Sequence, residues 1–578
     1  MFKQFLKALK ILEEEDRIGF YFICFFLIIS VFLEFLSFTL IVPIISIIFD
    51  TQSETKNILP FLNFEFLNKD YLNEILFAFL IIIILKLFIL YVFEKKLNTT
   101  LYKIQIDLNK NIYTHLLSQS WDQITKKSVS EISRIASGSD VMTYVTQGIY
   151  NYMIVIKNIS IMFALGIFLI RLNHEATIIL LLAFLLFTII FTKFHSKNAI
   201  NSSIEVKNLR DIKIKNNYET VQGLREVKLF GFAKKIVDYY SSNEGKIAVI
   251  QVKRRLVDLL PKIFLELTFI LTLLSFIFVF QNKGILIKFI PTISIFVLVF
   301  ARMVPLITTI NTLIQRIKFS NFGINETINL IQKSKNFKNK KKTDENLSEL
   351  KNIIKINDNS SIKIRNLSFS YGDNKVFDKI NLNFETNKII SVTGKNGSGK
   401  STFLDLLSTL IKPNNGDIKL DEKNLYDLRS SWRNEVGYLA QNFFIFDDTL
   451  LKNIVFYNSE NLNNQLLNSA LEISGVDEII NSLPNGLETN LGSMVKFLSG
   501  GQKQKIAIAR VIYRDPKIYI FDEPTSSLDA ESEKIFIETL KRLKSKNKFI
   551  FVITHSKNLI SNCDDVYLID DKKIIKSK

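Results

Sequence analysis

The sequence contains six long apolar stretches, which constrain its fold more than any other feature. Each offers roughly twenty or more mostly apolar residues, the length that an α-helix needs to cross the hydrocarbon core of a bilayer. The chain has 578 residues, more than one ordinary core holds, so we expect two or more domains. We place the membrane spans at Ile18–Ile48, Ile75–Phe93, Val145–Ile170, Ala176–Phe194, Val257–Phe280 and Ile285–Ile310.

The connections between these spans predict the topology. Residues 95–144 and 195–256 are polar, Lys-rich and helical in pattern, whereas the connections RLNHEA and QNKG are short turns. The positive-inside rule places the long basic connections and the N-terminus in the cytoplasm, so spans two and four continue inward as long helices. The first residues, MFKQFLKALKILEEEDR, predict a helix on the cytoplasmic membrane surface.

The net charge of +18 is compatible with two kinds of partner, nucleic acid or a membrane. Basic residues that flank apolar spans follow from the positive-inside bias and from anionic headgroups, so we favour the membrane and exclude nucleic acid. Cys24 and Cys563 are the chain's two cysteines and lie far apart in the sequence, so neither a disulfide framework nor a thiolate metal site is expected.

The second half of the chain has a different composition. Its β-rich runs, such as KIISVTG and KIYIFDEP, alternate with helical patterns, which is typical of an α/β domain with a largely parallel sheet. A dense charge run without apolar periodicity precedes it and is interpreted as a linker. We therefore predict a helical membrane domain over residues 1–330, a linker over 331–357 and an α/β domain over 358–578.

A phosphate-binding loop lies in the α/β half. The stretch SVTGKNGSGKST follows a β run, precedes a helical run and matches the pattern G-x-x-x-x-G-K-[ST] at Gly394, Gly399, Lys400 and Ser401. Backbone N–H groups of such a loop curl around phosphates, the lysine reaches the β and γ oxygens, and the serine hydroxyl binds Mg²⁺. ATP and Mg²⁺ are the predicted ligands. The loop's other predicted contacts are Asn396, Gly397, Ser398 and Thr402.

Two acids end the strand predicted in KIYIFDEP. Asp522 is placed to hold the Mg²⁺ shell, and Glu523 to polarise the attacking water. A plain acidic turn is the alternative, and the sequence LSGGQKQKIAIAR just upstream argues against it.

That upstream sequence resembles the signature of ATP-binding cassette (ABC) proteins through Leu498, Ser499, Gly500, Gly501 and Gln502. Further residues match the family in the same order along the chain. The resemblance implies that Tyr371 stacks on adenine and that Gln441 senses Mg²⁺ and the membrane domain. It also implies that Asp529 ends the loop between two sites and that His555 contacts the γ-phosphate.

The resemblance implies a second subunit as well. In ABC proteins the signature completes the ATP site of the opposite subunit, and this chain has one phosphate-binding loop and one signature. Because all motifs are intact, a homodimer is favoured over a heterodimer. The stretch TNLGSMVKFLSGG departs from the family, with Ser493 where exporters usually have Glu and Val495 where Gly is usual, at a segment that normally touches the coupling helices.

Six spans ahead of a cassette resemble the ABC exporter architecture, a six-helix membrane bundle followed by a P-loop ATPase domain. Its coupling helices are expected near SWDQITKK and TVQGLREVKLFG. The implied activity is ATP hydrolysis coupled to transport across a bacterial inner membrane, with the N-terminus and the ATPase domain in the cytoplasm.

A few charges lie inside the spans. Lys86 and Arg302 lie roughly 16 Å and 24 Å from the outer ends of their helices, too deep to reach the outer surface easily, so we expect them in a watery cavity, binding an anionic headgroup. Lys262 can instead pair with Glu266 four residues on. Lys157 can pair with a carbonyl group or with Glu34.

The segments LKLFILYVFEK, LPKIFLEL and TISIFVLVFARMVPL resemble bacterial lipid-linked oligosaccharide flippases. The resemblance implies that Lys86, Lys262 and Arg302 bind the pyrophosphate of a polyprenyl-linked glycan. It also implies an outward helix, within TQSETKNILPFLNFEFLNKDYL, that meets the lipid tail. The alternatives are export of a peptide, lipid or drug-like amphiphile, a cassette protein without transport activity, and an ATP-gated channel.

Overall fold

The computed structural model describes residues 14–48, 72–172, 174–280, 286–347, 356–357, 360–456, 462–544 and 547–578. The chain divides into two compact units, Met1–Gln119 with Ile124–Thr343, and Ser120–Gln123 with Asp344–Lys578. The predicted surface helix in the first residues and the outward helix of residues 51–72 fall almost entirely outside the described ranges.

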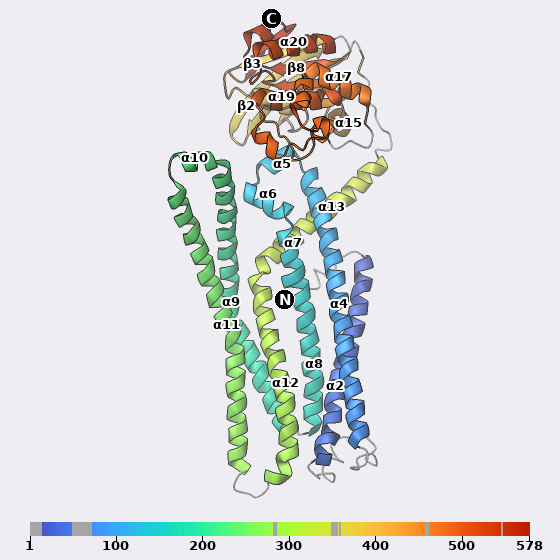
Figure 1. Ribbon diagram of the computed structural model, residues 1–578, viewed down its shortest axis with the longest axis vertical. Helices are drawn as coiled ribbons and strands as arrows, with labels where there is room; N and C mark the ends of the chain where they lie inside the picture. The colour runs from blue at the N-terminus through green and yellow to red at the C-terminus, as the bar shows by residue number, and fades with distance from the viewer. Residues whose placement is uncertain are drawn as a thin grey trace. The chain divides into compact units, whose positions relative to one another are not determined.

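The first unit is a bundle of long helices (Figure 1). Four of the predicted spans lie within single helices. The span Val145–Ile170 begins in the π-helix η3 (Tyr144–Tyr150) and continues in α8, and the described part of Ile285–Ile310 lies in α12. Three helices have 47 to 49 residues, or about 70 Å at 1.5 Å per residue, more than twice the hydrocarbon thickness of a bilayer. The prediction that spans two and four are parts of longer continuous helices is confirmed. The helices are α2 (Glu14–Ile48), α4 (Leu72–Ser118), α8 (Asn151–Leu172), α9 (His174–Gln222), α11 (Ala233–Phe280) and α12 (Leu286–Phe319).

Within the described residues, four segments are long and apolar enough to cross a membrane: Arg17–Val42, Leu72–Ser118, Ser139–Arg171 and Ser294–Phe319. They correspond to the predicted spans one, two, three and six. Spans four and five lie in α9 and α11, and their crossing of the membrane stays a prediction.

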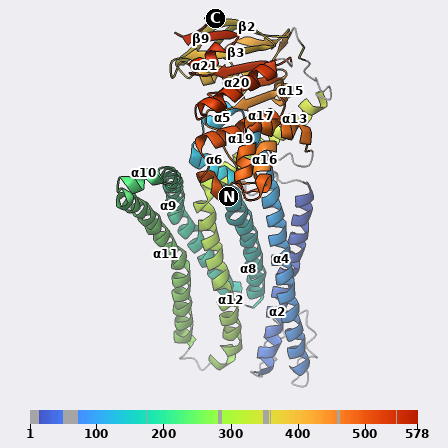
Figure 2. The same cartoon turned by 45° about the horizontal axis from the view of Figure 1, so that its top comes forward.

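The two long connections, between α4 and α8 and between α9 and α11, contain short helices. The first connection contains α5 (Trp121–Thr125), α6 (Val129–Ala136), α7 (Ser139–Thr143) and the π-helix η3 (Tyr144–Tyr150). The second contains α10 (Leu224–Leu229), and Figures 1 and 2 both show α9 and α11 side by side with α10 joining them at one end. Both predicted coupling segments thus include a short helix.

The segment after span six is helical. Helix α13 (Asn321–Leu347) includes the first part of the stretch 331–357 that the sequence predicts as a linker. It contains no Pro, and beyond Gly323 no Gly, and it is rich in Lys and Asn, so neither of the two strongest helix breakers interrupts it.

The second unit is an α/β domain with two sheets. A six-stranded sheet has the order β10-β9-β3-β8-β7-β6, with parallel pairing from β9 to β6, and a four-stranded antiparallel sheet has the order β2-β1-β4-β5. The largely parallel sheet confirms the fold prediction. The strands are β1 (Ser361–Tyr371), β2 (Asn374–Glu385), β3 (Lys388–Gly394), β4 (Asn415–Leu420), β5 (Lys423–Asn424), β6 (Val436–Leu439), β7 (Ile518–Asp522), β8 (Phe549–Ile553), β9 (Asp565–Asp570) and β10 (Lys573–Lys576).

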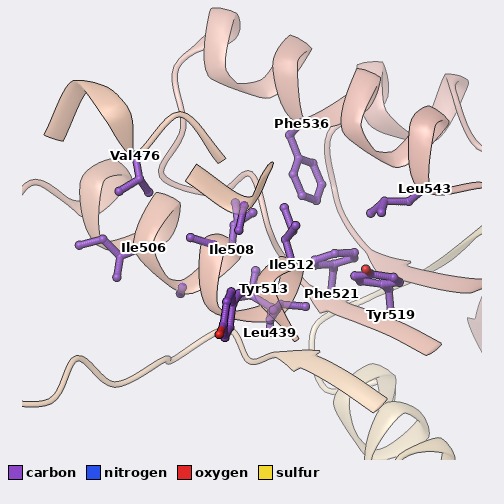
Figure 3. Close-up of a cluster of buried hydrophobic side chains, with 14 of the residues drawn as sticks. Leu439, Val476, Ile506, Ile508, Ile512, Tyr513, Tyr519, Phe521, Phe536 and Leu543 are labelled. Atoms are coloured by element: carbon purple, nitrogen blue, oxygen red, sulfur yellow. The ribbon is translucent and has the colours of Figure 1, made fainter. Parts of the chain in front are cut away.

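Central strands β7 and β8 are buried along their whole length, which explains their continuous apolar sequences. Phe521 packs edge-on against Phe536, and Tyr519 stacks on Phe521 (Figure 3). The remaining helices of this unit are α14 (Lys400–Leu407), α15 (Arg429–Asn434), α16 (Leu450–Val455), α17 (Asn464–Ser474), α18 (Asp477–Ser482), η6 (Gly486–Glu488), η7 (Ser493–Lys496), α19 (Gly500–Tyr513), α20 (Ala530–Lys544) and α21 (Lys557–Ser561).

Candidate functional site

The phosphate-binding loop connects β3 to α14. Gly399 has φ 104°, and a Cβ atom there would lie 2.6 Å from the Val376 side chain, so both the backbone and the packing require glycine. Lys400 folds back across the loop, where its Nζ donates to the carbonyl oxygens of Gly394 at 2.9 Å and Lys395 at 3.1 Å. The amine is thereby positioned over the loop before a phosphate arrives.

The loop's polar groups fit a phosphate. Among the described residues, the buried Ser398 Oγ has no hydrogen-bond partner, but Ser398 does not line the cavity, so its contact with a phosphate stays a prediction. The N-terminus of α14 begins directly after Gly399 and contributes free N–H groups and the positive end of the helix dipole.

The predicted metal ligands meet in part. Ser401 Oγ donates to Asp522 Oδ2 at 3.0 Å, which places two oxygens together at the carboxyl end of β7. Burial raises the pKa of Asp522, and Glu523 adds to this effect, whereas the hydrogen bond from Ser401 and the charge of Lys400 oppose it. Such a pair fits Mg²⁺, which takes few protein oxygens and fills its shell with phosphates and water. Gln441, the third predicted ligand, contacts Glu523 instead, its Nε2 donating to Oε2 at 2.9 Å.

Glu523 is held in an unusual conformation, with φ 51°. Its N–H donates to the carbonyl of Ile553 at 2.9 Å, and its own carbonyl accepts from Gln504 Nε2 at 3.1 Å. His555 Nε2 lies 3.8 Å from Glu523 Oε1. Gln504, which is 2% exposed and also accepts from Ser527 N–H at 3.1 Å, was not predicted from the sequence. The structure identifies Gln504 because its polar side chain is buried within α19.

One cavity of about 690 Å³ collects most of the predicted ATP-site residues. The loop, both acids, the glutamine and the histidine therefore form one site at the carboxyl ends of β3, β7 and β8. Its lining consists of Asn396, Gly397, Gly399, Lys400, Ser401, Thr402, Gln441, Asp522, Glu523 and His555.

The signature residues lie on a different surface. Ser499 caps α19 in a reciprocal pair with Gln502: Ser499 Oγ accepts from the Gln502 N–H at 3.1 Å, and Gln502 Oε1 accepts from the Ser499 N–H at 2.9 Å. A Cβ atom on Gly501 would lie 2.9 Å from the carbonyl oxygen of Ser527. Within the described chain, the cavity lining includes none of Tyr371, the signature or Asp529.

The two remaining predicted residues are solvent-accessible. Tyr371 ends β1, half exposed, and packs edge-on against Phe369. Hydrogen bonds from Ser532 lower the pKa of Asp529, which lies at the start of α20. Their roles toward a nucleotide stay predictions.

The membrane unit contains a buried ionic triad. Glu34 on α2 is 1% exposed; Arg302 Nε on α12 donates to its Oε1 at 2.7 Å, and Lys86 Nζ on α4 lies 2.9 Å from its Oε2. The carboxylate thus joins three helices. The sequence predicted Lys86 and Arg302 as partners in one site and missed Glu34 as the residue between them.

The other charges are paired elsewhere. Lys262 lies 3.8 Å from Glu266 one turn further along α11, and both side chains are exposed. Lys157 binds Glu94 Oε1 at 3.0 Å, so the suggested pairing with Glu34 is wrong, because both carboxylate oxygens of Glu34 already face cations.

Comparison with known proteins places the fold. The family model "ABC transporter" matches residues 377–526. A solved bacterial Atm1-family ABC exporter with ATP bound superimposes with a TM-score of 0.74 at 18% identity, covering 95% of this chain and 93% of that one. The chain has the fold of an ABC exporter. A helical membrane domain of the type I exporter kind precedes an α/β ABC ATPase domain.

Sequence relatives match a little over a third of this chain. An ATP-dependent lipid A-core flippase of Photorhabdus laumondii is 36% identical over 38% of this chain and 38% of its own length. One from Pectobacterium atrosepticum is 36% identical over 37% of each. ABC transporter B family member 21 of Arabidopsis thaliana is 35% identical over 37% of this chain and 17% of its own. The matches thus span well under two thirds of these relatives.

Proposed function

We propose that the chain is one half of a homodimeric, ATP-driven exporter that flips an amphipathic anionic substrate across a bacterial inner membrane, with the N-terminus and the ATPase domain in the cytoplasm. The favoured substrate is a polyprenyl-pyrophosphate-linked oligosaccharide. The observation that carries the substrate proposal is the ionic triad, and the cavity at the phosphate-binding loop carries the ATPase proposal.

The residues of that cavity have distinct roles in hydrolysis. Lys400 binds the β- and γ-phosphates and offsets the charge that develops on them. Glu523, fixed by Gln504 and within reach of Gln441, orients the attacking water and accepts its proton, while His555 donates a hydrogen bond to the γ-phosphate. Mg²⁺ held by Ser401 and Asp522 would neutralise charge on the phosphates.

Two observations support a second copy of the chain. Within the described residues, the cavity at the phosphate-binding loop is not lined by Ser499 of the same chain, which fits a signature that completes the site of a second copy. In addition, two large apolar side chains at the end of α10, Leu229 and Phe230, are 71% and 68% exposed. A partner subunit that covered them would bury this apolar surface.

The charge of the triad supports an anionic substrate. One carboxylate faces two cations, so the triad has a net charge of +1. Only Arg302 Nε binds Glu34, and its side chain is 41% exposed, which leaves the other guanidinium N–H groups to donate to a phosphate. Lys262, exposed on α11, is proposed as a third and weaker contact.

A second candidate function is export of a peptide, a lipid or a drug-like amphiphile. The lipid A-core flippases among the relatives favour a lipid, and the cassette they share with this chain does not specify which one. Neutralising Lys86 and Arg302 would have little effect on a neutral cargo.

Reconstituted flipping tests the proposal. Proteoliposomes with the full chain would receive a fluorescent polyprenyl-pyrophosphate oligosaccharide or the same lipid with a neutral headgroup, with and without ATP. Wild type should flip the pyrophosphate lipid only with ATP, and Glu523→Gln should not flip it. Equal flipping of both lipids would contradict an anion site, and flipping by Glu523→Gln would contradict ATP-driven transport.

A further inference from the structure

A second cavity, of about 570 Å³, lies between α9, α11 and α12. It is lined by polar and charged side chains that no step of the proposed transport cycle uses. Asn198 and Ser202 from α9, Lys253, Arg254 and Asp258 from α11, and Gln315 from α12 face it. A pocket of this volume is within the range that holds a small ligand.

Gln315 indicates that the cavity binds a polar group. Its side chain is 4% exposed, and both its Nε2 and its Oε1 lack a hydrogen-bond partner among the described residues. A buried amide without partners costs about 1–3 kcal/mol, and the cost is recovered if a ligand in the cavity binds it. Asp258 is in the same lining, and its Oδ1 is also buried without a hydrogen-bond partner in the described part of the chain.

The field in the cavity is positive. In the lining, the negative charges of Glu205 and Asp258 equal the positive charges of Lys253 and Arg254. Further arginines nearby make the net charge around the cavity positive. Burial lowers the pKa of Arg254; Asp258 opposes this effect, and Arg316, Arg210 and Arg255 add to it. Of these four arginines, only Arg254 is in the lining; the other three act on it from outside the cavity, and their positive charge favours an anion as the ligand.

Arg254 is positioned for such a ligand. Its guanidinium stacks on the ring of Phe319, 4.5 Å from the centroid. This cation–π contact holds the guanidinium at the cavity, where its N–H groups can donate hydrogen bonds to phosphate oxygens.

The cavity also lies at a defined depth in the proposed topology. Its residues lie around the cytoplasmic ends of the predicted membrane spans: beyond Phe194 in α9, at the start of the span that begins with Val257 in α11, and beyond Ile310 in α12, near the end of the apolar segment Ser294–Phe319. Gln315 is five residues past Ile310, about 7 Å along the helix, which is the thickness of the headgroup layer on one side of a bilayer.

We propose that this cavity binds the phosphate of an anionic phospholipid headgroup in the cytoplasmic leaflet, held by Arg254 and Gln315. The lipid would tie α9 and α11 to α12. The inference rests on the proposed topology and is independent of what the exporter transports.

The test measures lipid retained by the full chain. Nanodiscs of phosphatidylcholine containing phosphatidylglycerol would be dissolved in detergent, and the lipid that stays bound would be quantified by mass spectrometry. Wild type should retain phosphatidylglycerol, whereas Arg254→Gln and Gln315→Leu should each retain roughly tenfold less, the loss of one charged or buried hydrogen bond. Lys246→Gln, a charge loss on α11 outside the lining, should match wild type.

Two further arms keep the outcomes distinct. Gln315→Leu replaces an unpartnered amide, so it should be at least as heat-stable as wild type without the lipid; a drop in both stability and retention would assign Gln315 a structural role and overturn the proposal. Inorganic phosphate added to pure phosphatidylcholine nanodiscs should not bind Arg254. If it binds as well as the lipid, the ligand is soluble and the lipid assignment is wrong. Unchanged retention in both variants would also overturn it.

Discussion

Replacing Glu34 with glutamine tests the triad most severely. The change leaves Lys86 and Arg302 facing each other without their shared anion, and two unit charges about 6 Å apart repel by about 3 kcal/mol at an effective dielectric constant of about 20. Removing one member of a buried pair typically costs about 3–5 kcal/mol. Because Arg302 is 41% exposed and partly screened, we take the lower end, about 3 kcal/mol.

The assay is thermal unfolding of the full chain in detergent, followed by loss of monodisperse protein on size exclusion. At about 2–4 °C per kcal/mol, Glu34→Gln should lower the midpoint by roughly 6–12 °C. Arg302→Leu should lower it much less, because Glu34 keeps Lys86 as a partner. The double variant Glu34→Gln with Lys86→Met should recover most of the loss, since it leaves one half-exposed cation.

A double variant as unstable as Glu34→Gln, or less stable, would show that repulsion between Lys86 and Arg302 does not cause the loss. A Glu34→Gln protein with the melting midpoint of wild type would show that the predicted loss does not occur. In either case the stability of the bundle would not depend on compensation between these three charges.

Three further outcomes follow from the cassette. Glu523→Gln should lower ATP hydrolysis about 10²–10⁴-fold while ATP still binds, as measured by turnover and by nucleotide retention; a rate near wild type would remove Glu523 from its role as base. Ser499→Ala and Thr449→Ala both delete helix N-caps worth about 1 kcal/mol, but only Ser499→Ala should raise the KM for ATP; equal kinetics would argue against signature contact with nucleotide. Burial and then Asp522 raise the pKa of Asp405 to about 6, above its ordinary 3.8, so its contribution to stability is complete below about pH 4 and is lost as the pH rises through 6. Asp405→Asn should therefore flatten the melting midpoint between about pH 4 and 6 and raise it at pH 7.5, and an unchanged pH profile would contradict this assignment.

The residues that line the cavity at the phosphate-binding loop could be predicted from the sequence, whereas the roles of Tyr371, the signature and Asp529 stay predictions. Its groups lie in short contiguous motifs that end adjacent parallel strands, so the order β3-β8-β7 is enough to bring Lys400, Asp522 and His555 into one cavity. Gln504 escaped prediction because its role depends on the unusual conformation of Glu523, whose carbonyl it binds.

The membrane site could be predicted only in part. Depth along a helix identified Lys86 and Arg302, but partner choice depends on which helix faces meet, and Glu34 is 268 residues from Arg302. For the same reason the sequence suggested Glu34 as a partner of Lys157, whereas the structure pairs Lys157 with Glu94. The helical start of the predicted linker was missed because a charged segment without apolar periodicity can still form a helix when no Pro or Gly interrupts it.

The most direct test of the account is the number of pyrophosphate lipids flipped per ATP hydrolysed by Arg302→Leu, beside Arg302→Lys as the charge-preserving control. Removing the guanidinium takes the triad from a net charge of +1 to 0 without disturbing the Lys86–Glu34 pair or the cassette. Arg302→Leu should hydrolyse ATP but flip little lipid, and Arg302→Lys should flip it at an intermediate rate. Flipping by Arg302→Leu at the wild-type ratio would contradict an anion site in the membrane domain.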